Sequence, residues 1–98
     1  MLIKIHKSYR VVVAICDSNL KDKKFEQENK QLDLTSQFYQ GEEKTEQETI
    51  DLMKDMAKED ATFNIVGKQS VECAKKAGII TEEGIKTIHE IPYALVLL

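Results

Sequence analysis

Cys16 and Asp17 are the residues of this sequence best suited to chemistry, because they end an apolar run that is typical of a buried strand. A thiol at a strand end could act as a nucleophile if a general base lay beside it. The only imidazoles, His6 and His89, cannot be placed beside that thiol from the sequence. Free cysteine is also among the most buried residue types. We therefore expect Cys16, and equally Cys73, to be structural, with a nucleophilic Cys16 as the alternative.

Metal and phosphate motifs are incomplete. The two cysteines are 57 positions apart and no histidine pair occurs at helical spacing, so the sequence predicts no metal site, no cofactor and no catalytic residue. The segment Gly67–Ser70 is similar to the end of a phosphate-binding loop, but Thr62 stands where that motif needs an earlier glycine. We expect an ordinary helix start there. The alternative is a helix start whose N–H groups, with Lys68, hold an anion.

A basic segment with an aromatic residue lies near the N-terminus. Lys4, Lys7 and Arg10 flank Tyr9, which could stack on a base while the cations meet phosphates. Three lysines follow at positions 21–24. These residues favour a candidate RNA-binding surface, and the alternative is a strand face and a loop that merely face solvent.

Length and composition predict a single domain, and the charge is unevenly distributed along the chain. The 98 residues are 42% hydrophobic, which suits one domain over 1–98 with its own core. The net charge of −3 argues against a protein that is basic all over. Residues 1–30 nevertheless carry seven basic and four acidic side chains, whereas residues 31–60 carry three basic and nine acidic ones.

The localisation follows from what the sequence lacks. No apolar run approaches the roughly 20 residues that a membrane helix needs, and no signal peptide is evident. Two cysteines are few for a secreted domain of this size. We expect a cytoplasmic protein with no membrane partner.

Hydrophobic periodicity predicts the elements that position these residues. Thr45 and Glu48 form a capping box before a helix, which is the best-supported element. Asn64 is a plausible N-cap and Gly78 a plausible C-terminal glycine for a second helix. The residues between the second and third strands predict an irregular connection, and Pro92 predicts a bend. The expected elements are strands over 2–7, 10–16 and 31–37, helices over 46–59 and 65–77, a helical turn at 81–84, and two strands within 85–98.

This order of elements predicts an α+β fold, with a mostly antiparallel sheet of four to five strands and two helices packed on one face. We expect the valine-rich segment 10–16 and the C-terminal aliphatic segment to be neighbours in that sheet. The final strand is expected to be buried.

Several phrases of the sequence are similar to one known family. They are Val13–Asp17, Phe38–Gly41, Phe63–Gly67, Ala77–Gly78 and Ile91–Ala94. In this order, over nearly the whole chain, they resemble a family of short archaeal proteins of unknown function (domain-of-unknown-function family 424). The resemblance implies an archaeal, cytosolic origin and supplies no activity.

One departure from the family pattern bears on function. Members carry Asn-Leu-Val-Gly before the second helix and Pro-His-Ala near the end, and Tyr93 stands here where the histidine is expected. A tyrosine can donate a hydrogen bond or stack, so this substitution favours binding over acid–base catalysis.

Three hypotheses of function remain open. The leading one is a small cytosolic interaction domain without enzymatic activity, associated with RNA, a ribonucleoprotein or translation, or with another protein. The second is a small enzyme or ligand-binding domain whose site gathers Cys16, Asp17, Asn64 and Tyr93, with Lys68 added if the strand ends and the second helix start converge. The third is a homodimer that forms through the exposed edge of a terminal strand.

Overall fold

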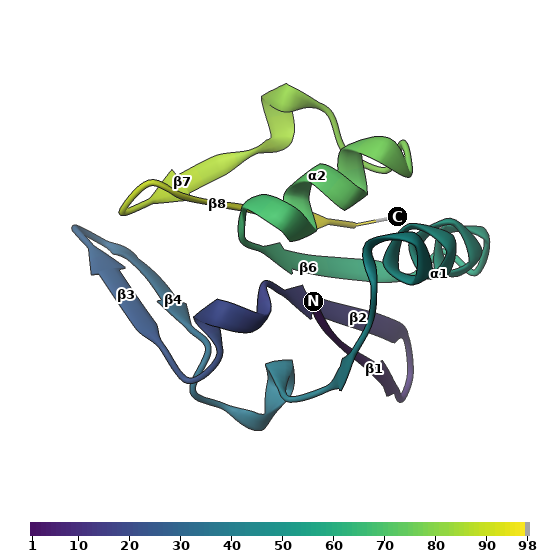
Figure 1. The fold of residues 1–98 in the computed structure, drawn as a ribbon, viewed down its shortest axis with the longest axis horizontal. Helices are drawn as coiled ribbons and strands as arrows, with labels where there is room; N and C mark the ends of the chain where they lie inside the picture. The colour runs from purple at the N-terminus through teal and green to yellow at the C-terminus, as the bar shows by residue number, and fades with distance from the viewer. Residues whose placement is uncertain (98) are drawn as a thin grey trace.

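A mixed sheet is built around two parallel strands. In the computed structural model, which describes residues 1–97, β2 (Val11–Cys16) pairs in parallel with β6 (Thr62–Val66). The six strands of this part of the chain have the order β5-β1-β2-β6-β8-β7 (Figure 1). The outer strands all pair antiparallel: β1 (Leu2–Lys7), β5 (Glu42–Glu43), β8 (Ile91–Val96) and β7 (Lys86–Ile88). The α+β class is confirmed, but the sheet has more strands than expected and is mixed.

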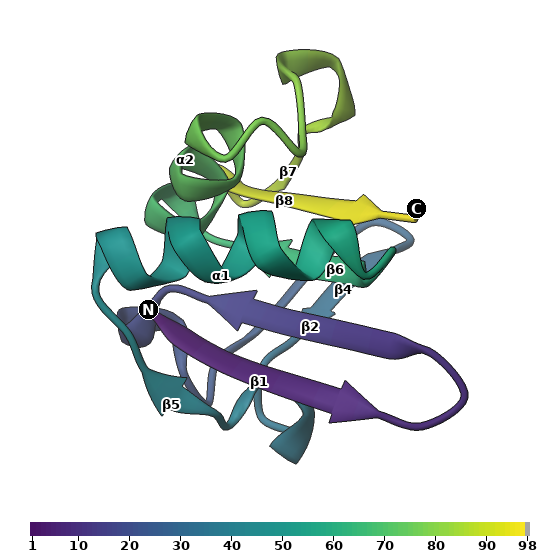
Figure 2. The ribbon, with the colours of Figure 1, turned by 90° about the vertical axis from the view of Figure 1, so that its right-hand side faces the viewer.

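Both helices cover the same face of this sheet. Helix α1 (Glu46–Lys58) lies in the sequence between the parallel strands, and a parallel pair needs such a crossover (Figure 2). Its predicted capping box is confirmed: Thr45 accepts from the Glu48 N–H and Glu48 accepts from the Thr45 N–H. Helix α2 (Lys68–Lys76) follows β6 directly. Side chains from both helices join those of the central strands in the larger core, which includes Met53, Val71 and Phe63.

The opposite face of the sheet is covered only in part. The expected irregular connection after β2 instead contains a 3-10 turn, η1 (Ser18–Leu20), and a hairpin of β3 (Lys24–Gln27) and β4 (Lys30–Asp33). A second 3-10 turn, η2 (Gln37–Tyr39), leads to β5. Leu20 and Leu34 from these segments are buried on Cys16 and Val66, in a second apolar cluster. We call this second face of the sheet, on the side opposite α1 and α2, the open face.

The predicted start of the second helix was wrong. Residues Thr62–Val66 form β6, so Asn64 lies within a strand and cannot cap a helix. Phe63 and Ile65 point to the helices, whereas Val66 belongs to the cluster on the other face. Thr62, Phe63, Asn64 and Ile65 do alternate between polar and apolar, but this alternation spans only four residues and runs directly into the helix, so the sequence signal for a separate strand is weak. Gly78, with φ of 78°, ends that helix as expected.

The predictions for the C-terminal strands also need correction. The β7–β8 turn is made by His89 and Glu90, which both have positive φ, while Pro92 lies inside β8. The Pro92 carbonyl accepts from the N–H of Gly67, just past the end of β6. Pro92 thus lies where the pairing of β6 with β8 ends, and its missing N–H interrupts no hydrogen bond within that pairing. Strand β6 separates β8 from the valine-rich β2, so the two are not direct neighbours. Leu95 is 59% exposed rather than buried.

Gly41 fixes how closely the segment before β5 approaches β1. A Cβ at this position would lie 2.0 Å from the carbonyl oxygen of Ile3. We expect Gly41→Ala to lower the free energy of unfolding by about 1–3 kcal/mol, because backbone atoms must separate to admit the methyl group. Gly84→Ala is the matched control, since a Cβ there meets no atom within 4 Å. Denaturant titration of both variants measures the difference, and equal stabilities would contradict the argument.

Candidate functional site

The carboxylate of Asp17 is bound by the first turn of α2. It accepts hydrogen bonds from the Gln69 N–H at 3.0 Å, the Ser70 N–H at 2.8 Å and the Ser70 hydroxyl at 2.7 Å. Asp17 is 5% exposed and Ser70 is fully buried. The free N–H groups of a helix start and the helix dipole both favour a negative charge at this place. Asp17 therefore caps a helix that begins about fifty residues later.

Gly67 allows this close contact. Its φ is 109°, and a Cβ there would lie 2.3 Å from the Asp17 carboxyl carbon. The sequence suggested that this helix start, with Lys68, could hold an external anion. The structure places the Asp17 carboxylate on the Gln69 and Ser70 N–H groups, so an external anion would have to displace it. Lys68 itself is exposed.

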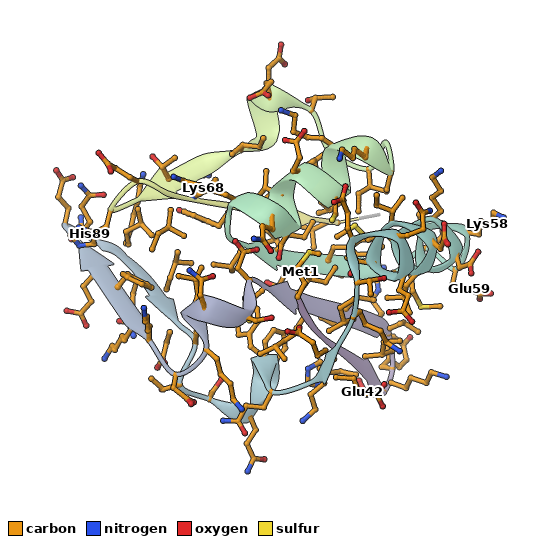
Figure 3. All side chains as sticks on the ribbon, viewed as in Figure 1. Met1, Glu42, Lys58, Glu59, Lys68 and His89 are labelled. Carbon is orange, nitrogen blue, oxygen red and sulfur yellow. The ribbon has the colours of Figure 1, made fainter. Side chains whose placement is uncertain are left out.

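Two adjoining cavities open beside this contact. The smaller is lined by Asp17 and Gly67, at the carboxyl ends of β2 and β6, and the larger lies between the starts of α1 and α2. Their volumes are about 600 and 550 Å³, and both are lined by Met1, Lys68 and Gln69. Figure 3 labels Met1 and Lys68 on this side of the molecule. The Met1 ammonium lies 2.8 Å from a carboxylate oxygen of Glu43, so part of the positive charge of this region is already neutralised. The carboxyl ends of parallel strands are a frequent place for ligands.

Cys16 lies away from these cavities, on the open-face side of the sheet. It pairs with Val66, which in turn pairs with Tyr93, so the three side chains form a row across β2, β6 and β8. The Cys16 thiol is fully buried. Burial, with a smaller effect of the Asp17 charge, raises its pKa from 9.0 to about 11. The thiolate that a nucleophile needs is therefore scarce at neutral pH.

Asn64 and Tyr93 line a crevice on the open face. It measures about 270 Å³ and lies between the β3–β4 hairpin and strands β6 and β8. Tyr39 closes one side, and burial raises the pKa of its hydroxyl to about 12, so it stays protonated. Asn64 and Tyr93 are both half-buried. The structure thus brings Asn64 and Tyr93 together, close to Cys16, but separates them from Asp17 and Lys68.

The basic N-terminal residues lie along β1 and the turn that follows it. Lys7, Tyr9 and Arg10 are exposed at the tip of the β1–β2 hairpin, and Tyr9 is 101% exposed. Lys4 lies on the open face, where its ammonium donates to the carbonyl of Gln37. His6 stacks on Phe38 beside it, with ring centroids 4.5 Å apart. The four predicted residues therefore share one hairpin, as their spacing suggested.

Neither a metal cluster nor a membrane helix is found in the described part of the chain. Among residues 1–97, no three His, Cys, Asp or Glu side chains come together as metal ligands. The helices of the same residues are too short or too polar to cross a bilayer.

The comparisons with known proteins establish the family. The family model described as "Protein of unknown function (DUF424)" matches residues 5–98. The chain belongs to this family. Among solved structures, an uncharacterized conserved protein from Methanopyrus kandleri matches with a TM-score of 0.86 and 21% identity, over 98% of this chain and 90% of that one. That likeness shows a shared fold. No curated protein matches.

The family phrases in the sequence lie around the two regions described above. Val13–Asp17 ends β2, Phe63–Gly67 forms β6 and the helix start, and Ile91–Ala94 begins β8. Sequence reasoning missed Ser70 and Tyr39, because a helix residue and a loop tyrosine carry no motif of their own. Gly67 was the available signal, since a glycine between a strand and a helix often marks a close approach of another group.

The Asp17 contact predicts a large and specific loss of stability. We expect Asp17→Ala to lower the free energy of unfolding by about 2 kcal/mol or more, because the buried Ser70 hydroxyl and two N–H groups lose their acceptor. Asp17→Asn keeps one acceptor oxygen and should lose less. Asp51→Ala on the exposed face of α1 is the control and should change stability by less than about 0.5 kcal/mol. Equal effects of Asp17→Ala and Asp51→Ala in urea unfolding would refute the capping role.

The raised pKa of Cys16 predicts a loss of stability in alkali. Between pH 9 and about 11 the unfolded chain releases the thiol proton while the folded chain retains it, so the unfolded state binds fewer protons. The contribution of Cys16 is therefore constant below pH 9 and falls as the pH rises toward 11. Comparing unfolding of the wild type with Cys16→Ala across this range isolates the thiol from other titrating groups. The wild type should lose more stability than the variant, and parallel curves would disprove the burial argument.

Proposed function

We propose that this protein is a non-enzymatic RNA-binding domain that uses the β1–β2 hairpin and the open face of the sheet. One observation carries the proposal: five of the six strands of the main sheet contain only basic and neutral residues. The exception is the short β5, Glu42–Glu43, and the β3–β4 hairpin adds Glu26 and Asp33. Across the described sheet, none of β1, β2, β6, β7 and β8 contains an aspartate or glutamate. Residues 1–16 carry Lys4, Lys7 and Arg10 and no acidic residue at all.

The cations that would meet phosphates lie along the β1–β2 hairpin and on the open face. Lys7 and Arg10 lie at the hairpin tip, and Lys4 lies further along β1. Lys86 pairs with Tyr93 across β7 and β8, which places it on the same open face at the other side of the sheet. The four acidic side chains of α1 lie on the opposite face of the sheet, whereas Asp33 lines the crevice on the open face. The overall negative charge of the chain therefore does not prevent local attraction of RNA.

Aromatic and amide groups supply contacts for bases. Tyr9 projects fully into solvent between Lys7 and Arg10, which suits stacking on an unpaired base. The crevice beside Asn64 and Tyr93 lies just below the roughly 300–1,000 Å³ typical of small-molecule pockets, so it suits a single splayed-out base better than a large cofactor. An asparagine amide can pair with a base edge, and single-stranded RNA exposes such edges.

The chemistry of the buried groups supports binding over catalysis. Cys16 is a buried, protonated thiol, and Asp17 is held by α2. Both would have to be released before they could act on a substrate. A cytoplasmic location, expected from the sequence, belongs to the same proposal because RNA is abundant there.

A small-ligand domain is the second candidate function. Two cavities of about 600 and 550 Å³ favour it by their size, and the smaller one lies at the carboxyl ends of β2 and β6, a frequent place for ligands. Such a ligand would meet Lys68 and Gln69 rather than Cys16 or Tyr93. Lys68→Ala would then weaken ligand binding and leave RNA retention unchanged.

RNA retention and its salt dependence test the leading proposal. We expect the wild type to bind single-stranded RNA in low salt, with a logarithmic salt slope that falls by roughly 0.7 for each phosphate contact removed. Lys7→Ala with Arg10→Ala removes two such contacts and should therefore lower the slope by roughly 1.4. Tyr9→Ala should weaken binding by about 1–3 kcal/mol through lost stacking, with little change of slope.

The helix face provides a matched control for this test. Lys54→Ala with Lys58→Ala removes the same number of charges from exposed positions of α1. This control should leave the slope unchanged. If the two double variants weaken RNA binding equally, or if the wild type does not bind in low salt, the proposed surface is wrong.

A further inference from the structure

Strand β8 is paired on its outer side over only half of its length. Its partner there, β7, is short: Ile88 pairs with Ile91, Thr87 with Pro92, and Lys86 with Tyr93. On the inner side, the pairing with β6 extends to Val96. Among residues 1–97, no strand lies on the outer side of residues 94–97. In Figure 2 this end of β8 forms the margin of the sheet, beyond the end of β7.

The backbone groups on this margin point outward at Leu95 and Leu97. The Gly67 N–H donates to the Pro92 carbonyl at 2.8 Å, so Pro92 faces β6. Backbone groups alternate along an antiparallel strand, which makes Ala94 and Val96 face β6 as well. The N–H and C=O groups of Leu95 and Leu97 therefore face away from β6, toward an unoccupied strand position.

An apolar groove runs along this unpaired edge. It measures about 330 Å³ and is lined by residues 78–81, Gly84 and the edge residues 94–97. Ile79, Ile80 and Val96 pack against the larger core, so the groove lies on the helix side of the sheet. Leu95 and Leu97 are 59% and 70% exposed. A strand added at this edge would insert alternate side chains into the groove.

The charge pattern leaves this edge without the usual protection. Natural edge strands are commonly guarded by charged side chains, which prevent pairing with other chains. The opposite edge of the sheet, β5, consists of Glu42 and Glu43, and β7 carries Lys86. Residues 91–97 contain no charged residue. The unpaired part of β8 is thus the one sheet margin of the described chain that offers free backbone groups, apolar side chains and no repulsion.

We propose that a second copy of this chain occupies this edge, so that β8 pairs antiparallel with the β8 of its partner. The geometry is self-complementary, because each copy presents the same outward groups at Leu95 and Leu97. Ala94 and Val96 line the groove on the helix side of the sheet, so pairing of the two β8 edges brings the apolar grooves of the two copies next to each other. An uncharged strand meets an uncharged edge, so no charge has to be buried.

This pairing joins the two sheets into one continuous sheet across the dimer axis. The open faces of the two copies then lie side by side, and Leu95 and Leu97 are covered in part at the junction. The edge involves neither Tyr9 nor the basic hairpin residues, so the dimer forms without the proposed RNA binding. Ala94 and Leu95 also line the crevice beside Asn64 and Tyr93, so RNA binding through the hairpin is the readout that stays independent of the edge.

Oligomeric state and amide exchange together test the proposal. Sedimentation of the whole chain from low micromolar to millimolar concentration should show a monomer–dimer equilibrium. The amide hydrogens of Leu95 and Leu97 should exchange slowly in the dimer and become fast on dilution. Leu95→Lys with Leu97→Lys places like charges across the axis and should abolish the dimer, while both positions are exposed enough for the chain to fold.

A control variant separates edge pairing from general loss of apolar surface. Tyr9→Lys replaces the most exposed large hydrophobic residue with the same charged side chain, far from β8, and should leave the dimer intact. A chain that stays monomeric at millimolar concentration, with fast exchange of the Leu95 amide, overturns the proposal. So does a dimer in which the Leu95 and Leu97 amides remain unprotected, because it must use another surface. A Leu95 amide protected only after an unrelated extended peptide is added assigns the edge to that class of partner and likewise overturns it.

Discussion

The contact between the Asp17 carboxylate and the start of α2 joins the segment that follows β2 to the helix that follows β6. Asp17 follows β2, and Gln69 and Ser70 begin the helix after β6, so the hydrogen bonds join the ends of the two parallel strands. The contact needs a glycine at position 67, whose missing Cβ leaves room for the carboxylate. It fixes where α2 lies on the sheet and thereby the shape of the neighbouring cavities. A helix cap from a distant segment is more constraining than a local one, because it ties tertiary structure to helix formation.

The two faces of the sheet have different chemical characters. One face is covered by α1 and α2 and forms the larger core. The other is covered only in part by the β3–β4 hairpin and η2, which leaves a crevice lined by Asp33, Asn64 and Tyr93. The groups able to do covalent or proton chemistry, Cys16 and Tyr39, lie under that partial cover with raised pKa values. The proposed binding function relies on this arrangement.

The edges of the sheet add a third property. β5 and β7 carry charges, whereas the unpaired end of β8 is apolar and uncharged. Membership of the family and the likeness to the Methanopyrus kandleri structure establish a shared fold without an assigned activity. The proposed RNA-binding face and the unprotected edge of β8 lie on the same sheet. They are compatible, because strand addition extends a sheet without covering its faces.

The sequence by itself determined the elements whose signals are local. The capping box at Thr45, the hairpin after Lys7 and the glycine that ends α2 at Gly78 each depend on contacts within a few residues. Tertiary structure decided the rest. Thr62–Val66 forms a buried strand because β2 and β8 flank it. For the same reason Asn64, which the sequence predicted as a helix cap, lines a crevice instead. Whether Asp17 would meet solvent, a ligand or a helix depended on residues some fifty positions away, and no short-range pattern encodes a contact of that separation.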